Sequence, residues 1–228
     1  SSGKSQAQGA LSMAVIRDIS LEAARGVDRE REFNLQTHCV SGLMLDLLPA
    51  LKTERTRKLV VEATPLEKQP GALELVGDIG VVGCAFDFAR FWRSQRAVQK
   101  QLIAECLHVG LRRAADVFRW DSAVVDRALE TASETGFLRE RRWRKPIKSP
   151  DRTATGEVWY RHESDRFDVE LRILDSGGGV VASGCVTTTR PHEAFLLDVL
   201  GKASWVGTNE FELESRDGER RWSITRLR

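Results

Sequence analysis

The sequence predicts an α+β fold in which antiparallel sheets flank a central antiparallel helical hairpin. In most segments before residue 92 and after residue 156, apolar residues alternate with polar ones, as in half-buried strands. Between them, residues 96–132 carry apolar residues three and four positions apart, which is the spacing of one helix face. Because strands neighbour strands on both sides of one helical pair, the pattern favours antiparallel sheet over a doubly wound fold.

The region before the hairpin is predicted to be mainly strands, at 13–22, 33–39, 58–64, 73–76 and 81–91. The charged segment 26–32 is typical of a turn. The segment 42–49 fits either a short helix or a buried strand. Pro65 and Pro70 bracket a loop, because proline limits the backbone on both sides of itself.

The helical hairpin is the clearest element of the sequence. Apolar spacing predicts a helix of about six turns over 96–118. Residues 119–121 break it, and the carboxylate of Asp121 is suited to cap the start of a second helix. That second helix is lined by apolar residues over 124–132, and Gly136 is a suitable stop. So short a connection makes the two helices antiparallel neighbours.

The region after the hairpin is predicted to begin with a loop over 139–155, in which Pro146 and Pro150 prevent regular structure. Alternating apolar residues then predict strands at 157–163, 167–173, 180–189, 211–213 and 222–224. Ser176–Gly179 and the Asp-Gly pair within 216–219 indicate hairpin turns. A short helix is expected within 191–201.

The chain is expected to be one domain over 13–228, with a possible boundary in 139–155 and a flexible tail or cloning remnant at 1–12. No apolar run reaches the ~20 residues of a membrane span, so we expect a cytoplasmic protein without a membrane partner. The four cysteines have no C-x-x-C spacing and are expected to be free, buried thiols. We expect no cofactor and no metal.

Positive charge is concentrated in the middle of the chain. Residues 91–155 carry 14 basic and 8 acidic residues, a net charge of +6. The expected partner-binding surface is the basic part of the 139–152 loop, made of Arg139, Arg141, Arg142, Trp143, Arg144, Lys145 and Lys148. Such a loop could bind an acidic protein surface or nucleic acid, with Trp143 stacking on a base, or it could be a solvated connector.

Candidate catalytic groups are scattered along the sequence. His108, His162, His192 and the cysteines lie far apart, so a hydrolase site would have to be assembled across segments. A pocket that gathers two of these groups with a carboxylate would favour an enzyme. The polar segment 162–168 is interpreted as a hairpin turn rather than a metal site.

Part of the hairpin region resembles a bacterial family. The matching residues are Phe86-Asp87-Phe88 to Phe91, Leu102-Ile103, Leu107-His108, Gly110-Leu111, Ala114-Ala115, Phe118, Trp120-Asp121, Ala128 and Gly136-Phe137, followed later by Trp205 and Phe211-Glu212-Leu213. This pattern covers about 60 of the 228 residues and resembles uncharacterised bacterial immunity-type proteins associated with polymorphic toxins. The resemblance implies a cytosolic, non-enzymatic inhibitor that neutralises a cognate toxin by direct binding. The alternatives are nucleic-acid binding through 139–152, or a hydrolase with a dispersed site.

Overall fold

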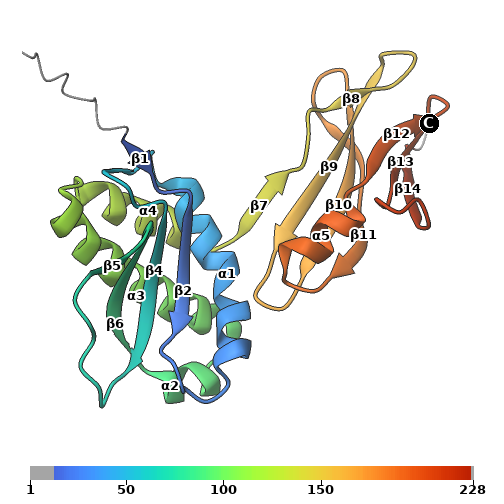
Figure 1. Ribbon diagram of the computed structural model, residues 1–228. Coiled ribbons are helices and arrows are strands. Elements are labelled where there is room, and N and C mark those ends of the chain that lie inside the picture. The colour runs from blue at the N-terminus through green and yellow to red at the C-terminus, as the bar shows by residue number, and fades with distance from the viewer. Residues whose placement is uncertain (1–12, 227–228) are drawn as a thin grey trace, which may run out of the picture.

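The chain folds into two lobes, each built around its own hydrophobic core (Figure 1). A computed structural model describes residues 13–226, so the tail expected at 1–12 lies outside the described residues. The first core runs from Ile16 to Phe137 and the second from Ala154 to Leu213. We call residues 14–137 the first lobe and 139–225 the second lobe. The boundary considered at 139–155 falls where one core gives way to the other, and the α+β class is confirmed.

The first lobe contains a four-stranded sheet with the strand order β2-β4-β6-β5. Its members are β2 (Asp18–Ala23), β4 (Lys58–Pro65), β6 (Ile79–Phe86) and β5 (Glu74–Val76). The strands β2, β4 and β6 are parallel, and β5 runs antiparallel to β6. A separate two-residue pair joins β1 (Ala14–Val15) to β3 (Lys52–Thr53).

The strand expected at 33–39 is wrong, because these residues belong to the helix α1 (Glu30–Leu47). The buried positions Phe33, Thr37, Val40 and Met44 recur every three or four residues, which is helical spacing. The ambiguous segment 42–49 is mostly the end of this helix. Since parallel strands need a crossover connection, α1 is also what allows β2 and β4 to run in the same direction.

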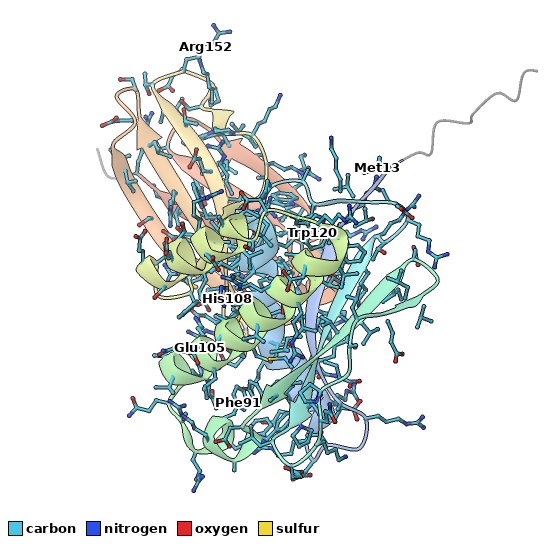
Figure 2. The ribbon with its side chains drawn as sticks, turned by 90° about the vertical axis from the view of Figure 1, so that its left-hand side faces the viewer. Met13, Phe91, Glu105, His108, Trp120 and Arg152 are labelled. Atoms are coloured by element: carbon cyan, nitrogen blue, oxygen red, sulfur yellow. The ribbon has the colours of Figure 1, made fainter. Side chains whose placement is uncertain are left out.

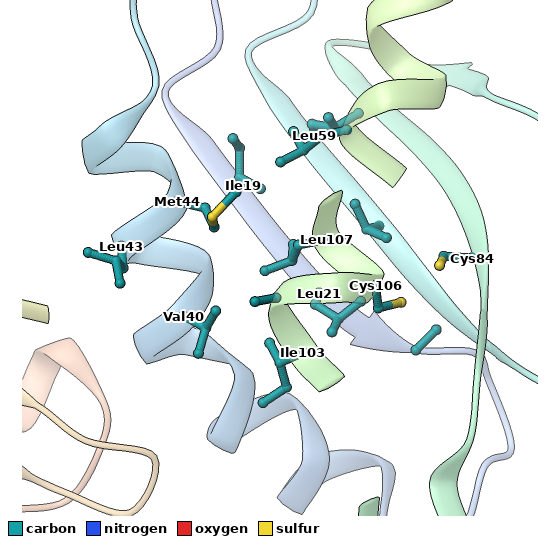
Figure 3. Close-up of a cluster of buried hydrophobic side chains, with 14 of the residues drawn as sticks. Ile19, Leu21, Val40, Leu43, Met44, Leu59, Cys84, Ile103, Cys106 and Leu107 are labelled. Carbon is teal, nitrogen blue, oxygen red and sulfur yellow. The ribbon is translucent and has the colours of Figure 1, made fainter. Parts of the chain in front are cut away.

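The helical hairpin is confirmed as α3 (Arg96–Phe118) followed by α4 (Ala123–Glu134). Figure 3 shows α3 in front of the parallel strands and α1 beside β2, with Ile103 and Leu107 among the buried side chains between them. Side chains of α1 hydrogen-bond the backbone of Leu21 along the free edge of β2. Gly136 has a φ of 62°, a left-handed conformation that suits glycine at a helix end. No helix within residues 13–226 has the length and apolarity that crossing a membrane requires.

The strand expected at 81–91 ends at Phe86. The Asp87 carboxylate accepts a hydrogen bond of 2.8 Å from the backbone N–H of Arg90, which starts the short helix α2 (Phe88–Arg93). A side-chain oxygen that satisfies a free N–H of the first turn favours a helix start over continued strand.

The second lobe consists of two antiparallel sheets joined by a short helix. One sheet has the order β11-β10-β9-β7, with β8 also paired to β9, and the other has the order β12-β13-β14. The first sheet contains β7 (Arg139–Arg142), β8 (Ile147–Lys148), β9 (Ala154–His162), β10 (Phe167–Asp175) and β11 (Val180–Thr189). The helix α5 (Glu193–Val199) leads to β12 (Lys202–Val206), β13 (Glu210–Glu214) and β14 (Arg221–Thr225).

Two expectations for this lobe need correction. The segment 139–155 is not free of regular structure, because its two ends pair with β9 as β7 and β8 and leave only short connections. The cysteine Cys185 is exposed rather than buried, since β11 lies at an edge of its sheet. The strand β12 was not expected from the sequence. The other strands and the helix at 193–199 lie where the apolar pattern predicts them.

We predict that Gly156→Ala destabilises the chain, because a Cβ at this position in β9 would overlap the Phe211 ring of the facing sheet. Overpacking of this kind costs about 1–3 kcal/mol. The matched control is Gly184→Ala in β11, where the new Cβ would sit at an ordinary 3.8 Å from Ile224. Urea denaturation should show a lower midpoint for the first variant and little change for the second. Equal midpoints would contradict the packing described here.

Candidate functional site: a cleft between the lobes

A cleft of about 500 Å³ lies between the two lobes. Its walls come from β2 and α1 of the first lobe, and from β7, β9 and the start of α5 in the second. Its charged and titratable residues are Arg17, Lys58, Arg139 and Arg141, then Asp18, Glu22, Asp46 and Glu193, and the histidines His38, His162 and His192. Cavities of this size at domain junctions are common ligand sites. We call this the interlobe cleft.

One wall of the cleft is fixed by Arg139, whose side chain is only 10% exposed. Its Nε donates a hydrogen bond of 3.0 Å to one Asp46 carboxylate oxygen, and Arg141 donates to the other oxygen at 3.2 Å. A Cβ at Gly42 would overlap the Arg139 guanidinium. Gly42 and Asp46 are four residues apart, so they share one face of α1 and together form a seat for an arginine of the other lobe.

His162, at the end of β9, is 2% exposed and stacks on Phe167 with ring centroids 3.8 Å apart. Its Nδ1 lies 3.4 Å from Nη1 of Arg139. Because a guanidinium only donates, Nδ1 accepts and the ring proton belongs on Nε2. That Nε2 is buried and has no hydrogen-bond partner within residues 13–226. Burial, and then the charge of Arg139, lower the pKa of His162 to about 3, so the ring is neutral.

The opposite wall carries a second ion-pair network. Lys58 lies 3.4 Å from the carboxylate of Asp18 and 3.3 Å from that of Glu22. The hydroxyl of Ser20 donates to Glu22 at 2.8 Å. These side chains project from the face of the parallel sheet opposite the helices, because alternate strand residues point to opposite faces. The sheet therefore supplies a polar wall for the cleft.

Two histidines stand at the mouth of the cleft. His192 accepts a hydrogen bond of 3.2 Å at Nδ1 from the backbone N–H of Ala194, which caps α5 and leaves Nε2 as the donor of the neutral ring. Partial burial, and then the nearby His192, lower the pKa of His38, while Asp18, Glu22 and Glu193 act in the opposite direction. The mouth thus presents imidazole rings among charges of both signs.

Further contacts fasten the lobes beside the cleft. Lys100 of α3, 9% exposed at its side chain, pairs with Glu163 at 2.6 Å. Arg96 pairs with Asp165, and the sulfur of Cys39 lies 3.6 Å from the Ser164 hydroxyl. The turn after β9 is therefore held against α1 and α3.

The structure divides the seven residues of the expected partner-binding surface. Arg139 and Arg141 line the interlobe cleft and pair with Asp46. Arg142 points elsewhere and donates to Glu157 at 2.8 Å. Three of the expected binding charges are thus neutralised by carboxylates of the chain itself.

The other four residues lie outside the cleft. Trp143 packs against the second core, and the Arg144 guanidinium covers its ring at 4.1 Å. Lys145 and Lys148 are exposed. Arg152, the last cation of the same segment, stands at the far tip of the second lobe (Figure 2). These side chains do not form one continuous basic surface with Arg139 and Arg141.

The dispersed histidines are partly brought together. His162 and His192 meet in the cleft, whereas His108 joins α3 to α4 by a 2.6 Å contact with Asp126 (Figure 2). His38 was not among the expected catalytic groups, because the strand wrongly predicted at 33–39 does not place it on one face with Gly42 and Asp46. The signal was present in the four-residue spacing of His38, Gly42 and Asp46, which is one face of a helix.

Comparisons with protein-family models, with curated proteins and with solved structures found no match. The interlobe cleft is therefore interpreted from its own residues. A second hollow of about 490 Å³ lies where β2, β4 and β6 end and is lined partly by Asp87, Phe88 and Trp92. Within residues 13–226, no group of three or more His, Cys, Asp or Glu side chains is placed to hold a metal ion.

We predict that His162 makes the folded chain less stable as the pH falls. The folded pKa of about 3 lies below the ordinary value of 6.5, so the unfolded chain binds the proton first. The contribution of His162 to the free energy of unfolding is fully present above pH 6.5. Below that pH it falls by about 1.4 kcal/mol per pH unit, until the folded pKa is reached. Urea unfolding at pH 7, 6 and 5 measures this slope. His162→Gln should reduce it by about that amount per unit, and an unchanged slope would show that His162 is not buried in the neutral form.

Proposed function

We propose that this chain is a non-enzymatic protein-binding module that holds a charged loop of a partner protein in the interlobe cleft. The observation that carries the proposal is the charge balance of the cleft, which has four cationic and four anionic side chains. A partner loop with charges of both signs would find complementary groups there. Such complementarity speeds encounter and rejects wrong partners.

The arrangement of these charges supports binding by a preformed surface. Arg139 and Asp46 fix one wall, and Lys58 with its two carboxylates fixes the other, so little order has to be gained on binding. At the mouth, the exposed side chains of Arg17 and Glu193 have no ion-pair partner within the described residues. They are the charges available to a partner.

The same charges weigh against nucleic acid as the ligand. Binding to phosphates depends on several cations that are free to replace counterions. Here the Arg139 and Arg141 guanidiniums share the Asp46 carboxylate, and Arg142 is paired with Glu157. A phosphate backbone entering the cleft would also meet the carboxylates that line it.

A narrower proposal is that the partner is a toxin. The resemblance of residues within 86–137, with Trp205 and 211–213, to bacterial immunity-type proteins supports an inhibitor that neutralises a cognate bacterial toxin in the cytoplasm. On this proposal, the partner loop in the cleft belongs to the toxin, and occupation of the cleft accompanies loss of toxin activity.

A hydrolase is the second candidate, favoured by one observation. His38, His162 and His192 gather in a single cleft with Asp18, Glu22, Asp46 and Glu193. Histidine and carboxylate side chains are the groups that most often act as general acids and bases in enzymes. The buried, low-pKa ring of His162 is suited to donate a hydrogen bond rather than to take up a proton at neutral pH. Because Nδ1 of His192 already accepts from Ala194, the proton acceptor would have to be His38.

We predict that reversing the two mouth charges weakens partner binding at least about tenfold. The variant Arg17→Glu/Glu193→Arg keeps the net charge of the cleft but inverts its pattern. A tagged chain is used to capture proteins from nuclease-treated lysate of the source cells, and retained proteins are quantified by mass spectrometry. We expect a stoichiometric protein held by the wild-type chain, with retention at least about tenfold lower for the variant, the equivalent of 1.4 kcal/mol.

The matched control is Arg127→Glu/Glu130→Arg, which inverts two exposed charges on α4. It should retain the same protein as the wild-type chain. If all three chains retain the same proteins, or none retains any, the cleft is not a protein-binding site. Material lost on nuclease treatment would point to nucleic acid instead.

A further inference from the structure

Two cysteines from different elements face each other in the first lobe. Cys84 lies on β6 and Cys106 on α3, and both are free and buried, at 3% and 4% exposure. Figure 3 shows them on the facing sides of the strand and the helix. This pair lies away from the interlobe cleft and has no part in the function proposed above.

The packing of α3 on the sheet places the two cysteines opposite each other. Gly110 sits against Val61 of β4, so closely that a Cβ there would overlap the valine side chain. Cys106 lies one helical turn earlier, a shift of about 5.4 Å, and Ala63 lies two strand residues further, about 6.6 Å. Ala63 pairs with Cys84 in the sheet register, so Cys106 lies over the part of the sheet where β4 and β6 carry these two residues.

Small residues keep this contact close. Gly110 has no side chain, and Ala63 has only a methyl group, so neither holds the helix away from the sheet. A disulfide needs Cα atoms within about 7 Å of each other, which requires such a close approach. Gly110 and Ala63 allow a closer approach of the helix to the sheet than larger side chains would.

The surroundings favour a thiolate on Cys84. The nearby Cys106 thiol, and then the positive charge of Arg113, lower the pKa of Cys84 in spite of its burial. The Arg113 guanidinium is held nearby by a hydrogen bond of 2.6 Å to the carbonyl of Gly83. The same contact and burial raise the pKa of Cys106. Cys84 is thus suited to attack an oxidant as a thiolate, and Cys106 is suited to react afterwards with the oxidised Cys84 sulfur.

We propose that Cys84 and Cys106 form a two-cysteine site that reacts with hydrogen peroxide. The Cys84 thiolate attacks one peroxide oxygen, the O–O bond breaks, and the departing hydroxide takes up a proton to become water. The sulfur of Cys106 then attacks the resulting sulfenic acid, and the S–O bond breaks as its hydroxyl leaves with the Cys106 proton as a second water. Two thiols lose two electrons to form a disulfide, and one peroxide is reduced.

The two other cysteines, Cys39 and Cys185, serve as internal controls for selective oxidation. Cys39 is buried beside Ser164, and burial raises its pKa, which disfavours the reactive thiolate. Cys185 is exposed but stands far from Cys84 along the chain, on an outer strand of the second lobe. An unselective oxidation would modify the exposed Cys185 before the buried pair.

The test treats the native chain with hydrogen peroxide, blocks remaining thiols with an alkylating reagent and maps disulfides by mass spectrometry without reduction. We expect a peptide pair linked through Cys84 and Cys106 that disappears on reduction with dithiothreitol. The linked pair should be lost in Cys106→Ser and retained in Cys185→Ser. In Cys106→Ser, a sulfenic-acid reagent should label Cys84.

The wild-type result alone decides the proposal, even if a core variant folds poorly. Absence of the Cys84–Cys106 link after peroxide treatment would overturn it, as would a link that forms equally with Cys39 or Cys185. A disulfide that forms only after the chain is unfolded in urea would also overturn it, because the proposal depends on the folded contact.

Discussion

The ion pair between the buried Arg139 and the partly exposed Asp46 is the interaction on which the arrangement of the two lobes depends. An arginine at 10% exposure is tolerated only when a carboxylate compensates its charge, and that carboxylate comes from the other lobe. Gly42 makes the seat possible, because any side chain there would occupy the space of the guanidinium. One face of α1 therefore fixes where β7 begins, and β7 in turn positions β9 and His162 through their shared register.

The interlobe cleft follows from this junction. Each lobe has its own apolar core, so the surface between them can be polar without weakening either core. The Lys58 network and the Arg139 pair each place charges of both signs on a wall of the cleft. His162 stays neutral because burial and the nearby Arg139 guanidinium lower its pKa. The paired charges hold the walls in place, and Arg17 and Glu193 at the mouth, which are unpaired within the described residues, are the groups that the proposed partner loop would meet.

The sequence predicts those elements whose apolar period is unambiguous. The hairpin α3–α4 and the strands β10 and β11 have long, regular patterns, and they lie where those patterns place them. The helix α1 was hidden because Phe33, Leu35, Thr37 and Cys39 alternate by chance as a strand would, and with it the parallel sheet was missed. The cleft could be foreseen only in part. Sequence shows that residues 139–142 are basic, but tertiary contacts alone decide that Arg139 meets Asp46 across 93 positions.

A double-mutant cycle on Arg139 and Asp46 tests the central claim most directly. The free energies of unfolding of Arg139→Ala, Asp46→Ala and the double variant are measured in urea at pH 7. If the pair joins the lobes, Asp46→Ala leaves the buried Arg139 charge without its carboxylate, whereas Arg139→Ala leaves the partly exposed Asp46 with Arg141. The two effects should then couple by about 1.5 kcal/mol or more. Effects that add to within about 0.5 kcal/mol would mean that the two side chains act independently, and that the cleft is not built on their contact.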